Sequence, residues 1–323
     1  MVLETAGVGA RVRRKRRGGL LREEARWGWL LQIPNIIGLL VFAAGPLIAS
    51  LVMIFMNWQI ITPPTYAGLD NFNTLFSDPL FAKALYNTVY ITVFSVPLYM
   101  ALGLLLALAL NQKLRGMAIY RVIFFLPSQM PAVANAILWL WLFNPDYGLV
   151  NWFLGLFHIP PSTWVQDPVM AKPALIIMGI WGVGVGMIIY LAGLQGIPQE
   201  LYEAAAIDGA GAWRRFRNVT LPMLTPVIFF SLIIGIINTM QSGFTTTYLF
   251  TGAQAGNGST DSGGPDNALL LMFLYIYHQG FVDFSMGYAS LLAWVLCVII
   301  LALTVINFKL AGRWVYYEGQ LRG

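Results

Sequence analysis

The chain has 323 residues, of which 58% are hydrophobic and 10% are charged, and its formal net charge is +5. Soluble domains carry about 25% charged residues, so a chain of this composition cannot cover a globular surface with polar groups. The composition therefore excludes an ordinary soluble enzyme or binding domain and predicts an all-α, multi-pass membrane protein.

Six apolar segments are long enough to cross a bilayer, which takes roughly 20 mainly apolar residues. None of them contains Asp, Glu, Lys or Arg, as expected because a charged side chain in lipid is costly. Prolines in or near most of these segments can kink the helices. The predicted spans are residues 33–56, 85–110, 122–143, 174–194, 223–250 and 286–308.

The basic residues lie almost entirely on one side of these spans. With the N-terminus inside, seventeen of the nineteen Lys and Arg residues fall in inner segments, and only Lys83 and Lys172 fall outside. Because loops rich in Lys and Arg stay in the cytoplasm, both termini are predicted to be cytoplasmic. The predicted parts are a cytoplasmic N-terminal segment 1–32, a transmembrane domain 33–312 and a cytoplasmic tail 313–323.

A basic cluster at residues 11–17 precedes the first span. Such a cluster can bind nucleic acid. Because a membrane span follows almost at once, we interpret it instead as an orientation signal that binds anionic lipid headgroups, and we expect no nucleic-acid partner. His158 and His278 lie far apart in the sequence and predict no metal site.

The last predicted outer loop has two parts. It opens with a polar stretch rich in Gly and Ser, residues 252–265, which is expected to be flexible. The apolar segment 269–281 follows, and it is too short to cross the bilayer. This segment predicts an interfacial or re-entrant helix.

Between the fourth and fifth spans lies a polar segment, residues 197–222. Pro198 suits the first turn of a helix, and glycines at 209 and 211 can end that helix. A second short helix is predicted over residues 212–219, and Pro222 restarts the chain as a membrane helix. We expect a helix–turn–helix across the cytoplasmic face, although an amphipathic connector lying on the bilayer has the same pattern.

This segment resembles the EAA loop of permease subunits in bacterial carbohydrate ABC importers. The family pattern is Glu-Ala-Ala, three residues, Gly, nine residues, an aliphatic residue, one residue and Leu-Pro. The matching residues are Glu203, Ala204, Ala205, Gly209, Val219, Leu221 and Pro222. Residues 111–116, 125–127 and 287–290 also resemble family segments, and the resemblance covers most of the chain from residue 33.

The resemblance implies the six-span type I ABC importer permease fold in a plasma or inner membrane. It also implies a second permease subunit, two ATPase subunits that bind ATP and Mg, an extracytoplasmic solute-binding protein and a sugar substrate. This chain would itself hold no cofactor, metal or catalytic residue. The residues implied in coupling to the ATPase are Glu203, Ala204, Ala205, Asp208, Gly209, Leu221 and Pro222.

The outer loop departs from the family pattern in one respect. In the family, a threonine at the end of the fifth span is closely followed by Gly-Gly-Pro. Here an extra polar stretch separates Thr251 from Gly263, Gly264 and Pro265. Whether residues 252–262 contact the binding protein is left open by the sequence.

The absence of two motifs also indicates, independently of the family, that the chain does not supply its own energy. The sequence has no G-x-x-x-x-G-K-[ST] motif to bind nucleotide phosphates. The predicted spans also contain no Asp, Glu or His for a proton relay. We therefore predict a transport subunit that is not an enzyme and takes its energy from a partner.

The spans offer neutral polar and aromatic groups of the kind that bind sugars. Asn238, Gln241 and Thr245 recur at helical spacing in the fifth span and are expected to share one face. Asn135 and Trp139 in the third span, with Trp181 in the fourth, complete the predicted pathway. The alternative is that these side chains bond neighbouring spans to one another.

Other functions remain open at this stage. The same architecture can import another small solute, such as a glycerol-phosphate-type molecule or a polyamine. A self-sufficient channel or membrane scaffold is a different class, which needs no ATPase. An intramembrane enzyme is less supported, because no nucleophile and base pair is visible within the spans.

Overall fold

A computed structural model describes residues 17–112, 114–255 and 263–316. The chain divides into two compact units, residues 1–52 and 53–323. The described residues contain four helices long and apolar enough to cross a membrane, or up to six if each of two bent helix pairs is one span. In these described ranges the protein is all-α apart from one small hairpin, in agreement with the predicted class. Most of the basic cluster, residues 11–16, lies outside the described part.

The first unit consists of helix throughout its described length. It contains α1 (Arg17–Leu39), a π-helical turn η1 (Leu40–Ala44) and all but the last residue of α2 (Gly45–Met53). Its candidate span, Glu24–Met53, begins well before the predicted residue 33. The large apolar side chains of this unit are exposed on all sides, as in a helix that lipid or another subunit surrounds.

The second unit opens with a short hairpin and an amphipathic helix. Strand β1 (Met56–Asn57) pairs antiparallel with β2 (Thr65–Tyr66). Helix α3 (Asp70–Ser77) follows, and Asp78 caps the next helix by accepting a hydrogen bond from the backbone N–H of Leu80 at 2.8 Å. This cap satisfies one of the free N–H groups at a helix start.

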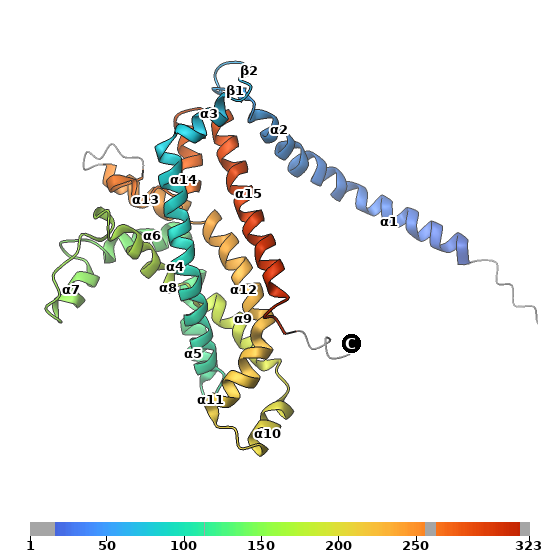
Figure 1. Ribbon diagram of the computed structural model, residues 1–323, viewed down its shortest axis with the longest axis vertical. Helices are drawn as coiled ribbons and strands as arrows, with labels where there is room; N and C mark the ends of the chain where they lie inside the picture. The colour runs from blue at the N-terminus through green and yellow to red at the C-terminus, as the bar shows by residue number, and fades with distance from the viewer. Residues whose placement is uncertain (1–16, 113, 256–262, 317–323) are drawn as a thin grey trace, which may run out of the picture. The chain divides into compact units, whose positions relative to one another are not determined.

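Helix α4 (Pro79–Leu110) is the long central element of this unit. It packs against α8, α9, α12 and α14, whose bounds are given below (Figure 1). It continues through Pro97 without a break. Its buried hydroxyls at Thr88, Thr92 and Ser95 donate to carbonyls four residues earlier in the same helix, and Thr88 Oγ1 also accepts from the backbone N–H of Met272 at 2.9 Å.

The predicted third span is sharply bent. It consists of α5 (Met117–Phe125), a 3-10 turn η2 (Leu126–Gln129) and α6 (Ala132–Leu142), with a 95° bend between the two halves. Met130 is extended at the bend because the ring of Pro131 disfavours a helical conformation in the residue before it. The predicted span 122–143 is thus broken near Pro127 and Pro131, two of the prolines expected to kink the helices.

The segment from 149 to 195 contains two short outer elements and a second bent pair. Helix α7 (Leu149–Gly155) and the 3-10 turn η3 (Trp164–Gln166) precede α8 (Ala171–Ile180) and α9 (Gly184–Gln195). The last two helices meet at 46°. A Cβ at Gly184 would lie 2.8 Å from the Cα of Phe125, so glycine allows α9 to approach α5 closely.

The next segment differs from the predicted pair of separate short helices. Helix α10 (Gln199–Ile207) is followed by α11 (Ala212–Arg215), a π-helical turn η4 (Phe216–Thr220) and α12 (Leu221–Gln241). The last three are one continuous helical run, because helical dihedral angles persist from one to the next. Pro222 therefore does not restart the chain. It lies inside this run, two residues after the π-helical turn η4 ends at Thr220, and it lacks the N–H that other residues in a helix interior donate.

Helix α13 (Phe244–Ala255) follows α12, and four elements complete the described chain: a 3-10 turn η5 (Pro265–Asn267), α14 (Met272–Tyr277), a π-helical turn η6 (His278–Val282) and α15 (Met286–Ala311). Residues 269–272 and Leu274 are buried, and α14 packs against α4 and α15. Of the two predicted alternatives for 269–281, an interfacial or a re-entrant helix, this burial argues against the interfacial one over most of residues 269–275, while Phe281 is 60% exposed.

Candidate functional site

The polar segment 197–222 forms a helical hairpin whose turn depends on one glycine. Gly209 has φ +73°, a conformation that costs other residues energy. In this turn the N–H of Ala210 donates to the carbonyl of Ala205 at 2.9 Å. The N–H of Gly209 donates to the carbonyl of Ala206 at 3.0 Å. Two carbonyls at the end of α10 are thereby satisfied.

The base of the hairpin is fixed to the membrane helices. The hydroxyls of Tyr202 on α10 and Thr220 on η4 lie 3.0 Å apart. Ile197, Leu194 and Leu224 are buried in the same apolar cluster, which also contains Tyr202 at its edge. Because both arms of the hairpin pack on this cluster, α10 is tied to the start of α12.

The side chains at the tip of the hairpin are exposed. Ile207 is 88% exposed and Trp213 is 73% exposed, and the Trp213 ring stacks on Phe216 with centroids 5.5 Å apart. The predicted coupling residues Glu203, Ala204, Asp208 and Gly209 are also exposed. Large apolar side chains beside small and charged ones make a surface suited to a protein partner. The sequence reasoning missed both Ile207 and Trp213.

The remaining predicted coupling residues have different surroundings. Ala205 is half-buried, and Leu221 and Pro222 are half-buried at the start of α12. Glu203 accepts a hydrogen bond from Gln199 at 3.1 Å. The described residues contain one ion pair, Lys83–Asp266 at 3.0 Å, so the charges of the hairpin form no ion pair within this part of the chain.

A cavity lined by both apolar and neutral polar side chains lies between α4, α6, α8 and the junction of α12 with α13. Its volume is about 520 Å³. Three of the predicted pathway residues line it together, Asn135, Gln241 and Thr245, and Ser95 and Tyr99 of α4 join them. No residue of the lining is charged. The cavity therefore presents hydroxyl and amide groups from helices far apart in the sequence.

A smaller cavity of about 180 Å³ adjoins the first. Asn238, another predicted pathway residue, lines this one and not the larger cavity. Tyr99, Gly179, Gly182 and Thr239 line both. Since the two cavities share these walls, they form neighbouring chambers along α4, the α8–α9 bend and α12.

The two predicted tryptophans lie in different surroundings. Trp139 is 7% exposed, with its ring centroid 4.9 Å from Phe143 and 5.5 Å from Trp181. Neither tryptophan is among the cavity-lining residues, although Trp181 lies between Gly179 and Gly182, which are. The Trp139 Nε1 and the Asn135 Oδ1 are buried and have no hydrogen-bond partner in the described residues.

The predicted shared face of Asn238, Gln241 and Thr245 does not exist as one helical stripe. Helix α12 ends at Gln241, and Ser242 is extended while Gly243 has φ +95°. Helical spacing fails across this break, because the residues after Gly243 start a new helix. The cavity wall, and not one helix face, brings Gln241 and Thr245 together.

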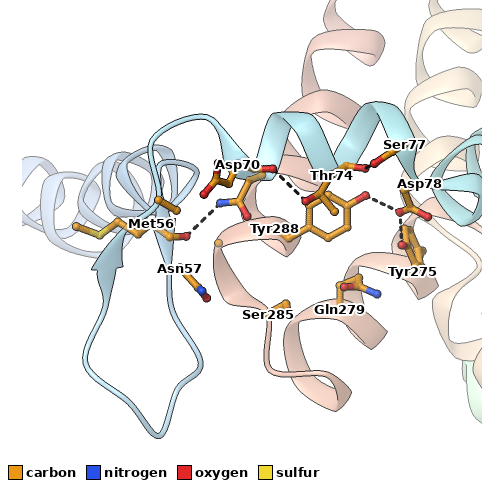
Figure 2. Close-up of a pocket in the computed structure, with 13 residues that line it drawn as sticks. Met56, Asn57, Asp70, Thr74, Ser77, Asp78, Tyr275, Gln279, Ser285 and Tyr288 are labelled. Carbon is orange, nitrogen blue, oxygen red and sulfur yellow. Dashed lines mark hydrogen bonds between the residues drawn. The ribbon is translucent and has the colours of Figure 1, made fainter.

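A third pocket, of about 510 Å³, lies between the β1–α3 region and the α14–α15 region. Figure 2 shows its polar side chains, with the carboxylate of Asp78 facing the two tyrosines. Tyr275 and Tyr288 both donate to Asp78 Oδ2, the second at 2.5 Å. Burial and the bond to this carboxylate raise the pKa of Tyr275 above its ordinary value. The pocket floor thereby joins the start of α4 to the C-terminal helices.

The sequence reasoning had no signal for this network or for a second one beside it. Asn87 of α4 donates to the carbonyls of Asn267 and Leu270 at 2.9 and 3.0 Å, and it accepts from Lys172 at 3.2 Å. These contacts join residues that are 85 to 183 positions apart. No local pattern marks such partners. In the described residues, no group of three His, Cys, Asp or Glu side chains could hold a metal.

Comparison with known proteins gives one family and several close relatives. The family described as "Binding-protein-dependent transport system inner membrane component" matches residues 99–315. A "Probable ABC transporter permease protein YesP" of Bacillus subtilis is 38% identical over 97% of this chain and 99% of its own length. The "Trehalose/maltose transport system permease protein MalF" of Thermococcus litoralis is 35% identical over 90% of this chain and 95% of its own.

One solved structure has the same fold over nearly its whole length. It is a bacterial ABC transporter involved in the import of the acidic polysaccharide alginate. The similarity has a TM-score of 0.77 and 25% sequence identity, and covers 91% of this chain and 99% of that chain.

Proposed function

The chain belongs to the family of binding-protein-dependent transport system inner membrane components, and from this premise we propose that it imports a neutral sugar or oligosaccharide. It is a non-catalytic, multi-pass permease subunit of an ABC importer. Its companions would be a second permease subunit, two ATPase subunits that bind ATP and Mg, and an extracytoplasmic solute-binding protein. Both termini and residues 197–222 would face the cytoplasm.

The hairpin 197–222 would carry force from the ATPase. Its tip exposes Ile207, Trp213 and the carboxylate of Asp208 for docking, while its base is fixed to α9 and α12. Because the hairpin continues directly into α12, a displacement of the tip moves that helix as a body. Helix α12 ends at the cavity, so this connection would link the ATPase to the transport path.

The substrate would pass through the two adjoining cavities. Asn135, Gln241, Thr245 and Asn238 supply amides and hydroxyls along them. Trp181 supplies an aromatic face close by. Hydrogen-bonding groups of this kind beside a ring bind sugar hydroxyls and sugar faces.

The observation that carries the sugar assignment is the uncharged lining of the 520 Å³ cavity, which contains no Asp, Glu, Lys or Arg. A charged solute that entered this cavity would lose its hydration without gaining an oppositely charged partner, and this costs free energy. The trehalose/maltose relative supports the same class of cargo. We therefore favour a neutral sugar over glycerol-phosphate-type molecules and polyamines.

The test is uptake into liposomes by the whole transporter, purified by affinity from its native membrane. The cognate binding protein is offered a set of labelled neutral mono- and oligosaccharides, glycerol phosphate and a polyamine. ATP-dependent uptake of a neutral sugar alone is the expected result. Uptake of only a charged solute overturns the sugar assignment. Uptake without any co-purifying ATPase would instead identify a channel.

A further inference from the structure

Helix α7 carries an apolar stripe that no described part of the protein covers. Leu149, Trp152, Phe153 and Leu156 recur at the spacing that places side chains on one helix face. They are 62%, 64%, 54% and 57% exposed, and Phe157 beyond them is 63% exposed. In Figure 1, α7 lies apart from the helices α4, α12 and α15.

The other side of α7 packs against the protein through Asn151, which is buried, and through Val150 and Leu154, which are half-buried. Asn151 is 9% exposed and donates to the carbonyls of Pro145 and Ser162 at 3.1 and 2.9 Å. It also accepts from Trp164 Nε1 at 2.7 Å. Leu154 packs on the apolar cluster that contains Phe143 and Trp164. When one side of a helix packs on the protein and its other side is also apolar, that second side is expected to be buried against lipid or another protein.

The charges and composition of the lobe indicate which environment contacts the apolar stripe of α7. From residue 122 to residue 171 the chain has no Lys or Arg, and its two acidic residues are Asp146 and Asp167. Trp is enriched at the boundary between headgroups and acyl chains, and Trp, Phe and Leu form the apolar face of helices that lie there. The absence of basic residues favours zwitterionic lipid over an anionic surface.

The stripe also continues an exposed apolar surface on a candidate span. Val133, Ile137 and Trp141 lie on one face of α6 and are 51%, 41% and 66% exposed. Helix α6 belongs to a candidate span, and Gly148, the residue before α7, follows Trp141 by seven residues. Apolar exposure thus runs from the span into α7 with little interruption.

We propose that α7 is an interfacial helix whose apolar stripe is seated in the bilayer leaflet opposite the coupling hairpin. The inference rests on the proposed topology, in which residues 143–171 and 197–222 lie on opposite membrane faces. Ring contacts connect this lobe to the cavity region. Trp164 stacks on Phe143 at 5.0 Å, and Phe143 contacts Trp139, which contacts Trp181. Lipid around α7 therefore holds the region beside the cavity in place.

Site-directed spin labelling of the assembled transporter tests whether the apolar stripe of α7 contacts lipid. In a Cys297→Ser background, single cysteines replace Trp152, Leu156 or Phe157, and the labelled complex is placed in phosphatidylethanolamine-containing nanodiscs. The matched control is Tyr66→Cys in the β hairpin, where the native side chain is 81% exposed. Three sites on the stripe keep the test valid if one substitution prevents folding. The readout is the accessibility of each label to oxygen and to a water-soluble nickel complex.

The expected result is an oxygen-to-nickel accessibility ratio several-fold higher at the stripe than at residue 66. A ratio equal to that of the control, with or without added binding protein, overturns the proposal because the stripe then faces water. Labels shielded from both reagents also overturn it, because a companion subunit then covers the stripe. The readout does not depend on transport, so a wrong sugar assignment leaves the result unchanged.

Discussion

The hydroxyls of Tyr202 and Thr220 lie 3.0 Å apart, although 18 residues separate them in the chain. One belongs to α10 and the other to the π-helical turn that leads into α12. The bond closes the base of the hairpin 197–222, while Ile207 and Trp213 are exposed at its tip. The hairpin is thus hydrogen-bonded where it meets the membrane helices and exposed at the end where the proposed partner would dock.

Tyr202→Phe should loosen this base without unfolding the subunit. The variant loses one part-buried hydrogen bond, which is worth about 1 kcal/mol. We expect ATP hydrolysis to continue while sugar uptake per ATP falls. Both rates are measured in liposomes, with Tyr120→Phe as the control because Tyr120 is exposed on α5. An uptake-to-hydrolysis ratio equal to that of the control would show that the bond transmits no force.

Gly209→Ala should disturb the turn of the hairpin through its backbone. Gly209 has φ +73°, and this left-handed conformation costs a residue with a Cβ about 1–2 kcal/mol. We expect reduced coupling, and a stronger loss in Gly209→Pro, which cannot adopt a positive φ. Gly211→Ala is the matched control, because Gly211 has φ −69° and open space around it. Normal coupling in both Gly209 variants would be evidence against the role of this turn.

Ile207→Ser combined with Trp213→Ser should weaken binding of the ATPase. These side chains are 88% and 73% exposed, and exposed aromatic and aliphatic side chains often anchor protein interfaces. The measurement is the amount of ATPase that co-purifies with the permease. Phe76→Ser is the control, because Phe76 is 86% exposed on α3 at the other end of the unit. Equal recovery of the ATPase from both variants would exclude the tip as the docking surface.

Gln241→Ala should lower sugar-stimulated uptake while the complex still assembles. Gln241 lines the 520 Å³ cavity at the break between α12 and α13, so its loss removes a donor and an acceptor for a sugar hydroxyl. Asn307→Ala is the matched control, because Asn307 bonds the carbonyl of Leu303 within α15 and lines neither cavity. Unchanged uptake by Gln241→Ala would remove this residue from the pathway.

Asp78→Asn should destabilise the contact between the start of α4 and the C-terminal helices. Tyr275 and Tyr288 both donate to its carboxylate, and hydrogen bonds to a charged group are worth about 1.5–3 kcal/mol each. We expect a lower unfolding temperature for the purified complex. Asp70→Asn is the control, because Asp70 is exposed at the rim of the same pocket. Equal unfolding temperatures would contradict a structural role for Asp78.

The same network predicts how stability changes with pH. Burial and the bond to Asp78 raise the pKa of Tyr275 above its ordinary value of 10.0. Because the folded-state pKa is the higher one, this contribution to stability is complete below pH 10 and decreases as the pH rises further. Unfolding temperatures measured between pH 8 and pH 11 should fall less steeply for Tyr275→Phe than for the unchanged protein.

The sequence predicted the class of protein and the elements that depend on local patterns. The six apolar runs predicted an all-α membrane protein because lipid demands long stretches without charge. The glycine at 209 predicted the turn after α10, since a positive φ is a local requirement. The coupling residues of the hairpin and the inside location of both termini remain predictions.

The bends and the junctions were harder to predict. Prolines at 127 and 131 indicated a kink in the third span, but the 95° angle depends on where α5 and α6 find partners. Gly243 lies in an apolar run whose sequence predicts a continuous helix. The helix instead breaks there, so Asn238, Gln241 and Thr245 do not share one helix face as expected. A single glycine is tolerated in helices, so its position alone does not predict a break.

The sequence by itself determined that this chain lies in a membrane and where it is polar, because hydropathy and glycine or proline chemistry act over a few residues. Only the tertiary structure decided that Asn135, Gln241 and Thr245 line one cavity and that Asp78 joins Tyr275 and Tyr288. Asn135 lies about a hundred residues before Gln241 and Thr245, and Asp78 lies 197 and 210 residues before Tyr275 and Tyr288. Their meeting is set by helix packing, which depends on the complementarity of whole surfaces and leaves no periodic signal along the chain.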